Sequence, residues 1–373
     1  MAALQKKKKN PIGKIILFVV ELLLLAGLLV VLWVVLKATD ENEGVDRITI
    51  SEDVIRVEMN ETVQENETMK GYRNIALFGV DSRAGYLKTN TRSDSIMIAS
   101  VNLETKEVKL VSVYRDTYLD VQKQSGDYYF NKCNSAYAFG GAEQAIRMLN
   151  KNLDMDITDF VTIGFEGLRD VIDALGGVYI EVDDAEIKHI NNYQRDMVEE
   201  LESVTEYTPV TEIGYQLLNG LQATAYCRIR YTAGSDFKRT ERQREVLKAC
   251  LDTAKTASPS ALLKICNNVF SEVYTSLDLQ EILDLLGGIT EYNIVDEGGF
   301  PRKSDLKTGK FGSAGDCIMP VALEDSVVWL HEFLFGEKNY QVSDVVADYG
   351  KYVRDFVDAN SKKVEASEDF PTE

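Results

Sequence analysis

The stretch YCRIRYTAGSDFKRTERQR, residues 226–244, carries six lysine and arginine side chains around a single aspartate. The chain as a whole is acidic, with a formal net charge of -19. Arginines that gather against the overall sign favour a polyanionic ligand, because the guanidinium fork matches phosphate oxygens in bidentate geometry. The stretch therefore predicts an anion-binding site.

From Arg239 onward, the spacing of the apolar residues is that of a helix. At about 100° per residue, one side of a helix over residues 239–254 is the apolar, core-facing side. That side carries Arg239, Arg242, Gln243, Val246, Leu247, Cys250 and Ala254. A guanidinium on such a side costs several kcal/mol unless a charge or ligand neutralises it. A solvated basic face, paired with its own carboxylates, is the interpretation that fits Lys238, Arg244 and Lys248.

The residues just before the helix read as an extended segment. Arg228 and Arg230 alternate with Cys227 and Ile229, so both arginines would project from one face. Two elements could thus direct four arginines toward one place, the other two being Arg239 and Arg242.

The N-terminal part predicts a membrane anchor. Residues 15–36 form an apolar run of 22 residues interrupted only by Glu21, with lysines before it and acidic residues after it. A cleaved signal peptide would have a shorter apolar region of roughly 7 to 15 residues and a small-residue cleavage site. We expect a cytoplasmic basic tail (1–14), a transmembrane helix (15–36), an extracytoplasmic stalk or N-terminal extension of the fold (37–72), one large domain (73–353) and a disordered acidic tail (354–373).

Strand-like and helix-like segments alternate within the large domain. Strands are expected at 74–80, 95–102, 108–113, 160–164 and 178–182, with a hairpin between the second and third. Helices are expected at 141–149, 168–175, within 219–271, at 279–292 and at 324–335. The pattern predicts an α/β (α+β) sandwich with a mixed central β-sheet flanked by helices.

The numbers and spacing of cysteine and histidine residues restrict the kinds of active site that the chain can form. The five cysteines include no C-x-x-C pair, and there are only two histidines. A zinc site and histidine acid–base chemistry are therefore disfavoured, which leaves aspartate, glutamate and arginine as the chemical actors.

Polar residues follow or precede three of the predicted strands. Asp81 follows the first strand, Arg92 and Asp94 lead into the second, and Arg115 ends the third. If these strands are neighbours, Asp81 and Asp94 form a pair of oxygen ligands suited to Mg²⁺, and Arg115 can contact the same phosphates. Each residue alone could equally be a turn residue or a local ion pair.

Seven short motifs, in order along the chain, resemble the LytR-CpsA-Psr family of cell-envelope glycopolymer transferases, from about Asn74 to Ala257 with a continuation to about Val353. They are NIALFGVDSR (74–83), RSDS (92–95), VSVYRDT (111–117), NKCNSAY (131–137), DALGGV (173–178), LNGLQA (218–223), and RIR (228–230) with DFKR (236–239) and RQ (242–243).

The resemblance implies a transferase that takes a glycan from a polyprenyl-pyrophosphate carrier and joins it through a phosphodiester to peptidoglycan, or in some members to a glycoprotein. It implies that Asp81 and Asp94 bind Mg²⁺ and that Arg115, Asp236 and Arg239 are catalytic, with Asp236 a base or an orienting carboxylate. The residues implied to surround the pyrophosphate are Arg92, Arg115, Lys132, Arg228, Arg230, Arg239, Arg242 and Gln243.

The sequence departs from the family pattern at two places. Tyr114 replaces the usual proline before the Arg-Asp pair, and Cys133 replaces the isoleucine of the usual Lys-Ile-Asn. Neither change removes a charged contact. The expected partners are a lipid-linked glycan, a peptidoglycan acceptor and the membrane, with no nucleic acid. Two other functions use the same arginines: a signalling ectodomain that binds an anionic lipid or polymer without turnover, and a pyrophosphatase that releases the lipid to water.

Overall fold

The computed structural model describes residues 46–47, 58–81, 87–88, 90–122, 128–201, 203–230, 235–258, 262, 265 and 273–360. The chain divides into two units, residues 1–45 and 46–373, and all described residues belong to the second. The predicted membrane segment, residues 15–36, lies outside them. None of the helices that the structure describes combines the length and the apolar character of a membrane span.

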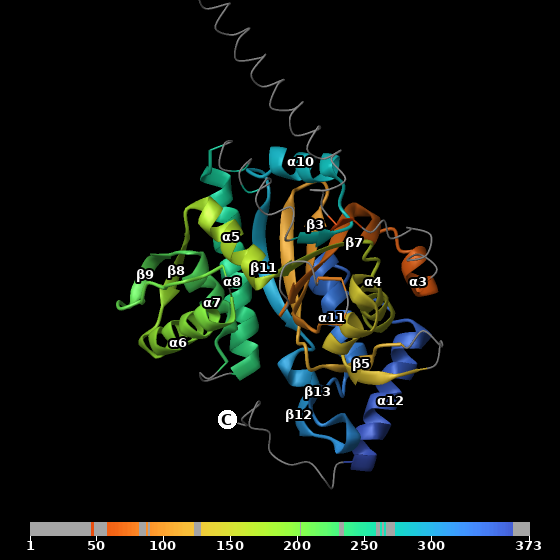
Figure 1. Ribbon diagram of the computed structural model, residues 1–373. Coiled ribbons are helices and arrows are strands. Elements are labelled where there is room, and N and C mark those ends of the chain that lie inside the picture. The colour runs from red at the N-terminus through yellow and green to blue at the C-terminus, as the bar shows by residue number, and fades with distance from the viewer. Residues whose placement is uncertain are drawn as a thin grey trace, which may run out of the picture. The chain divides into compact units, whose positions relative to one another are not determined.

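A mixed seven-stranded sheet forms the centre of this unit, in the order β1-β10-β7-β2-β3-β4-β11 (Figure 1). Its strands are β1 (Asp46–Arg47), β2 (Tyr72–Val80), β3 (Ser93–Asn102), β4 (Glu107–Val113), β7 (Asp159–Gly164), β10 (Val273–Thr275) and β11 (Asn293–Phe300). β3 pairs antiparallel with both β2 and β4, whereas β7 runs parallel to β2 and β11 parallel to β4. The predicted hairpin is therefore confirmed, and so is the mixed sheet.

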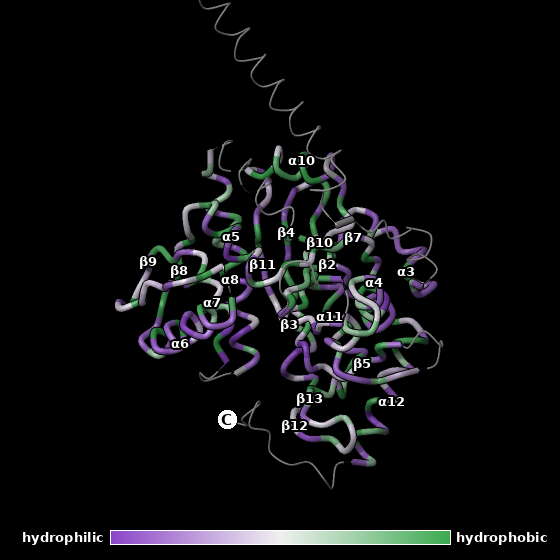
Figure 2. Tube along the Cα trace, viewed as in Figure 1, coloured by the Kyte–Doolittle hydropathy of each residue, from purple (hydrophilic) through white to green (hydrophobic). Residues whose placement is uncertain are grey.

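Helices cover both faces of the sheet because its central strands are apolar on both sides. On one face Phe78, Ile98 and Val111 pack with residues of α4 (Asn134–Leu153), α11 (Leu323–Phe335) and α12 (Asp344–Asn360). On the other, Val101 and Leu110 pack with Leu247 of α8 (Ser235–Thr256). Figure 2 shows the hydrophobic residues concentrated on the central strands.

A second core cluster surrounds a two-stranded ribbon of β8 (Val178–Val182) and β9 (Gly214–Leu218). The helices around it are α5 (Phe165–Leu175), α6 (Asp184–Glu200), α7 (Gly220–Arg228) and α8. The predicted strand at 178–182 is present, but it belongs to this ribbon and not to the central sheet.

The remaining elements are short or lie at the edges. They are α3 (Glu61–Gln64), η1 (Met69–Gly71), β5 (Tyr118–Asp120), β6 (Phe130–Lys132), α10 (Leu279–Gly287), η3 (Lys303–Asp305), β12 (Lys307–Lys310), η4 (Gly312–Ala314) and β13 (Asp316–Met319).

Four predicted boundaries are wrong. The expected helix at 141–149 begins earlier, at Asn134, and kinks at Gly140 and Gly141. The helix expected at 279–292 ends at Gly287, because the Gly287-Gly288 pair terminates it and β11 follows. The N-terminal stalk is shorter than expected, since Met59, Val63 and Met69 are buried in the main core.

The C-terminal boundary is the fourth. Helix α12 continues to Asn360, past the predicted start of a disordered tail at 354. Val357 is buried against Tyr118 and Phe311, so burial of apolar surface holds this last part of the helix in place.

Candidate functional site

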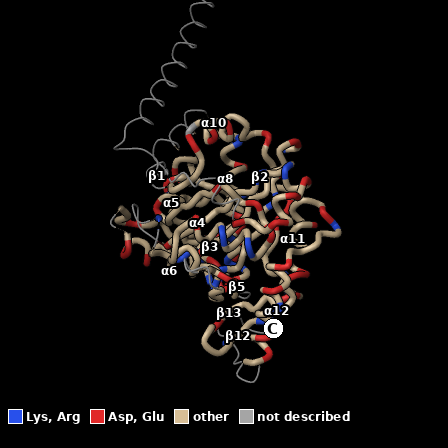
Figure 3. Tube along the Cα trace, turned by 90° about the vertical axis from the view of Figure 1, so that its right-hand side faces the viewer, with Lys and Arg blue, Asp and Glu red and all other residues tan. Residues whose placement is uncertain are grey.

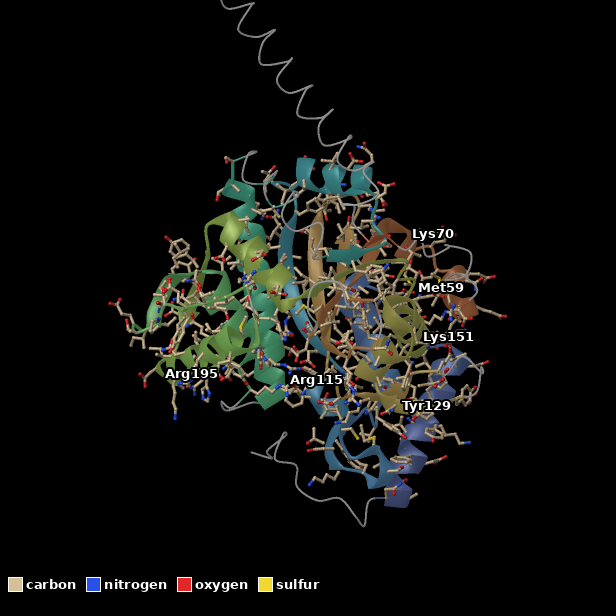
Figure 4. The ribbon with its side chains drawn as sticks, in the orientation of Figure 1. Met59, Lys70, Arg115, Tyr129, Lys151 and Arg195 are labelled. Atoms are coloured by element: carbon tan, nitrogen blue, oxygen red, sulfur yellow. The ribbon has the colours of Figure 1, made fainter. Side chains whose placement is uncertain are left out.

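The edge of the sheet where β2 ends, β3 begins and β4 ends brings the predicted strand-end residues together. Antiparallel pairing of the three strands places Asp81, Asp94 and Arg115 at this edge. Arg115 Nη1 donates to Asp94 Oδ1 at 2.6 Å. The predicted convergence of strand ends is confirmed for this pair, and Figure 4 places Arg115 between the lower end of α8 and β13.

Two further arginines reach Asp94 from the stretch 226–244. Arg230 Nη2 lies 3.5 Å from Asp94 Oδ2, and Arg239 Nη2 donates to the backbone carbonyl of Asp94 at 2.9 Å. Three guanidinium groups from three separate segments therefore meet at one residue. Arg115, Arg230 and Arg239 are called the cationic cluster below, and Figure 3 shows lysines and arginines gathered around the labels of β3 and β5.

Asp236 holds two members of the cationic cluster. Its Oδ1 lies 2.9 Å from Arg239 Nη2 and 3.7 Å from Arg115 Nε. Asp236 and Arg239 stand three residues apart in the first turn of α8, so they share a side of the helix. Their exposed fractions are only 4% and 2%, which makes this a desolvated ion pair.

Lys132 extends the cationic cluster through Asp116. Lys132 Nζ lies 2.9 Å from Asp116 Oδ1, and Arg115 Nε lies 3.4 Å from Asp116 Oδ2. The Cys133 thiol donates to the carbonyls of Tyr114 and Arg115, both at 3.2 Å, so it ties the start of α4 to this turn.

Arg228 stands beside the cationic cluster on an aromatic support. Its guanidinium lies 4.6 Å from the ring centre of Phe165 and 5.4 Å from that of Tyr193, and its Nη1 is 3.3 Å from Glu200 Oε2. Cation–π contacts of this kind fix an arginine without consuming all of its donors.

The carboxylates at the sheet edge respond to these charges. Burial alone would raise the pKa of Asp94, but Arg115, Arg239 and Arg230 hold it below its ordinary value. The pKa of Asp81 is raised, first by partial burial of its carboxyl and then by the like charge of Asp94, although Arg228 acts in the opposite direction. Asp81 and Asp94 are thus close enough to repel each other.

The surroundings of Arg239 destabilise the charged form of its guanidinium group. Burial, together with repulsion from Arg115 and Arg230, lowers the pKa of its guanidinium to about 10, even though Asp236 and Asp94 favour the charged form. A bound anion would relieve this repulsion.

Three further predicted pyrophosphate ligands neither belong to the cationic cluster nor flank it. Arg242 is directed at α6, where its Nε donates to Glu186 Oε1 at 2.8 Å and its Nη1 donates to the Ile229 carbonyl at 3.2 Å. Gln243 Nε2 donates to the Cys227 carbonyl at 3.5 Å. Arg92 is exposed and takes no part in these contacts.

Two local predictions in the arginine-rich stretch are wrong. Residues 226–228 are not extended but form the last turn of α7, because Asn219 and Gln222 form a capping box that starts this helix. Arg244 is not on a solvated face. It is 5% exposed and donates to Ser112 Oγ of β4 at 2.7 Å, since α8 lies directly on the sheet.

Tyr114 and Asp116 also contribute to the site, although the sequence motifs assign them no role. The Tyr114 ring packs edge-on against Phe237, at 4.6 Å between centres, and so links the end of β4 to the first turn of α8. Their positions directly before and after Arg115 in the sequence are the feature that could have indicated this role.

Comparison with known proteins gives this site a family. The sequence model described as the LytR_cpsA_psr family matches residues 34–305. The chain belongs to this family. The resemblance expected from the seven motifs is confirmed.

Two named relatives and one solved structure illustrate the likeness. The polyisoprenyl-teichoic acid–peptidoglycan teichoic acid transferase TagU of Enterococcus faecalis is 30% identical over 228 residues, which cover 61% of this chain and 68% of the relative. Biofilm regulatory protein A of Streptococcus mutans is 32% identical over 243 residues, which cover 60% of this chain and 57% of the relative. The chain therefore spans only about two thirds or less of the length of these relatives.

The solved structure is the LytR-CPS2A-psr family protein YwtF (TagT) with bound octaprenyl pyrophosphate lipid. It superposes with a TM-score of 0.52 at 21% identity and covers 77% of this chain and 99% of its own. This likeness shows the mixed α/β fold of the family. The transferase names of the relatives fit the prediction of a glycopolymer phosphotransferase.

Proposed function

We propose that the protein is a phosphotransferase that moves a glycopolymer from a polyprenyl-pyrophosphate carrier to peptidoglycan. The main support is that the guanidinium groups of Arg115, Arg230 and Arg239 all contact Asp94. Guanidinium groups held in fixed orientations are suited to the oxygens of a diphosphate. The names of the relatives support the proposal, since they specify a polyisoprenyl-linked teichoic acid and peptidoglycan.

The proposed reaction balances without a nucleotide. A hydroxyl oxygen of the acceptor attacks the phosphorus that carries the glycan, and the bond from this phosphorus to the bridging oxygen breaks. Polyprenyl phosphate leaves, a phosphodiester forms, and the hydroxyl proton passes to a base or to water. The cationic cluster stabilises negative charge on the transferring and leaving phosphates.

Asp236 is better suited to orienting the neighbouring arginines than to acting as a base. Both of its near partners, Arg115 and Arg239, are guanidinium groups, and it is almost fully buried. A carboxylate in that position fixes the direction in which the two arginines face the substrate. Arg228 and Lys132 flank the cationic cluster and would contact outer phosphate oxygens.

We propose that Asp81 and Asp94 would hold a magnesium ion. Asp94 Oδ2 lies 3.5 Å from Arg230, beyond a short ionic hydrogen bond, so it can still accept a ligand bond. Within the described residues no group of three or more histidine, cysteine, aspartate or glutamate side chains could hold a metal. Two carboxylates completed by water and phosphate are the usual protein environment of Mg²⁺, which would neutralise phosphate charge when bound.

The proposed location follows from the apolar run at residues 15–36. A single span with the N-terminus in the cytoplasm places the domain outside the membrane, where lipid-linked glycan and peptidoglycan are present. We propose no nucleic-acid partner, because the chain is strongly acidic outside the cationic cluster.

The direct test is a transfer assay with the full chain in detergent micelles. Lipid-pyrophosphate oligosaccharide, Mg²⁺ and peptidoglycan are expected to give a phosphodiester-linked product, and Arg115→Ala is expected to abolish it while the protein stays folded. Chelation by EDTA should lower turnover. Binding without product would favour the signalling ectodomain, and release of soluble glycan phosphate would favour the pyrophosphatase.

A further inference from the structure

A polar pocket of about 370 Å³ lies in the second core cluster, apart from the cationic cluster. It is formed by α5, by the loop before β9 and by the start of α7. Its hydrogen-bonding residues include Arg169, Asp170, Asp173, Glu206, Tyr207 and Asn219. Neither the family resemblance nor the proposed reaction gives these residues a role.

The walls of the pocket are held together by side-chain hydrogen bonds. Arg169 Nη1 donates to Ser203 Oγ at 2.9 Å, and Ser203 Oγ donates to Glu166 Oε1 at 2.6 Å, so the loop is tied to α5. Asp173 Oδ1 accepts from the Gly220 backbone at 2.7 Å, which ties α5 to α7. A pocket with its walls fixed in this way loses little entropy when it binds a ligand.

Helix α5, which forms one wall of the pocket, begins beside Arg228. Phe165, the first residue of α5, supports the Arg228 guanidinium. At about 1.5 Å per residue, Arg169 lies about 6 Å and Asp173 about 12 Å farther along the same helix. The helix that forms one wall of the pocket therefore begins at a residue that contacts Arg228, which flanks the cationic cluster.

The charge of the pocket is opposite to that of the cationic cluster. Asp170, Asp173 and Glu206 face one arginine, and Arg169 Nε is already paired with Asp170 Oδ1 at 2.6 Å. Such a lining repels phosphate groups and accepts hydrogen bonds from hydroxyl, amide and ammonium groups. The lipid-linked donor is therefore disfavoured here, and a carbohydrate without phosphate is favoured.

An exposed aromatic surface adjoins the pocket. The outward face of the β8–β9 ribbon carries Tyr179 and Tyr215, which are 52% and 70% exposed and stack at 5.3 Å between ring centres. Leu217, 49% exposed, continues this face and stands two residues before Asn219 of the pocket. The outward side of a ribbon is ordinarily polar, so an apolar surface here indicates a partner, and flat rings suit the apolar faces of sugar rings.

We propose that the pocket and the adjoining ribbon face bind the glycan strand of the peptidoglycan acceptor. The inference rests on the proposed function, and it assigns the two substrates to regions of opposite charge. The cationic cluster takes the diphosphate of the donor. The acidic pocket takes the amino-sugar strand with its amine-bearing peptides, and α5 connects the two.

Co-sedimentation of the full chain, in detergent micelles, with purified peptidoglycan sacculi tests this site. Two double variants are used, Glu206→Gln with Tyr207→Ala in the pocket and Tyr179→Ala with Tyr215→Ala on the ribbon. Each is expected to weaken binding about tenfold, as loss of an anchoring contact does. Tyr128→Ala is the matched control, because Tyr128 is likewise an exposed tyrosine, at 63%, with an aromatic contact to Tyr349 at 5.4 Å between ring centres.

The outcomes separate this inference from the proposed function. Arg239→Ala should lose transfer and keep sedimentation, whereas the double variants should lose sedimentation and show a raised KM for the acceptor. Pocket-dependent sedimentation without any transfer by the native protein would overturn the proposed function and support the acceptor site. The acceptor site would be overturned by unchanged sedimentation of both double variants or by an equal loss in Tyr128→Ala. It would also be overturned if size-exclusion chromatography showed a dimer for the native protein and a monomer for the ribbon variant.

Discussion

Arg239 is the residue on which the proposed chemistry depends most. It is 2% exposed and contacts both the Asp94 backbone and the Asp236 carboxylate. Arg239→Ala should lower transfer by about 10² to 10³-fold, the usual effect of removing a preorganised charge-stabilising donor. The neighbouring Lys238 pairs with Glu241 on the exposed side of the same helix, so Lys238→Ala should retain activity. Activity in Arg239→Ala equal to that of the Lys238 variant would contradict this role.

Arg242 has a structural role, in contrast to Arg239. Its guanidinium and the Glu186 carboxylate form an ion pair in which both side chains are almost fully buried. Glu186→Gln leaves an uncompensated buried charge and should lower the free energy of unfolding by about 3 to 5 kcal/mol. Glu241→Gln breaks an exposed pair and should cost less than about 1 kcal/mol. Denaturant titration measures the free energy of unfolding of both variants. Equal decreases would show that the buried ion pair contributes no more to stability than the exposed one.

The fate of the arginines shows what residue patterns can predict. The helical period correctly placed Arg239 and Arg242 on the buried side of α8. It could not say which partner each would meet, because that depends on where α6 and β3 lie. The start of α6 is visible in the sequence as the capping box formed by Asp183 and Glu186.

At the scale of elements, the close approach of β4 and β11 fixes the turn that carries Arg115. Gly299 of β11 lies against the Tyr114 ring, and a Cβ there would overlap the Tyr114 Oη and Cζ atoms. Gly299→Ala should destabilise the protein by about 1 to 3 kcal/mol, as overpacking does, and lower activity through displacement of Arg115. Gly287, at the end of α10, has open space around it, so Gly287→Ala should be tolerated. Thermal unfolding that does not distinguish the two variants would contradict the proposed contact.

Helix α11 carries a pH-sensitive contact in the main core. His331 stacks on Tyr340 at 3.5 Å between ring centres, and its Nε2 lies 3.1 Å from the Leu153 carbonyl. Burial lowers the pKa of His331, although Asp154 and Glu337 act in the opposite direction. The unfolded chain therefore binds a proton more readily than the folded one, and stability should fall as the pH drops below about 6.5.

Melting temperatures at pH 7.5 and 5.5 test the histidine prediction. His331→Gln should reduce the loss of stability over this range. His189, the other histidine in the sequence, is the control, and His189→Gln should behave like the native protein. The prediction fails if the native protein and His331→Gln lose the same stability on acidification.

Elements with regular patterns were predictable, and irregular edge elements were not. β2, β3 and β4 have apolar runs with a clear turn between the last two, so the sequence predicted their pairing. β11, with sequence NIVDEGGF, has no period-2 pattern, and its burial alternates poorly because it lies at the edge of the sheet. Missing β11 also caused the wrong placement of Arg244, whose neighbours lie on β4 and β11.

At the scale of the whole molecule, positive and negative charge are concentrated in different regions. An acidic chain gathers three arginines at one edge of the sheet, and the adjoining second core cluster presents an acidic pocket and an aromatic surface. The anion site was predictable from composition, because charge against the overall sign is visible in sequence. The acceptor site was not, since it depends on a loop, a helix and a ribbon that only the fold brings together.

The most direct test of the central claim is a crystal structure of the full chain with a soluble prenyl pyrophosphate, geranyl pyrophosphate, and Mg²⁺. The account predicts diphosphate density against Arg115, Arg230 and Arg239, and its loss in Arg239→Ala. Diphosphate bound elsewhere on the molecule, with the cationic cluster still closed on Asp94 and Asp236, would contradict it.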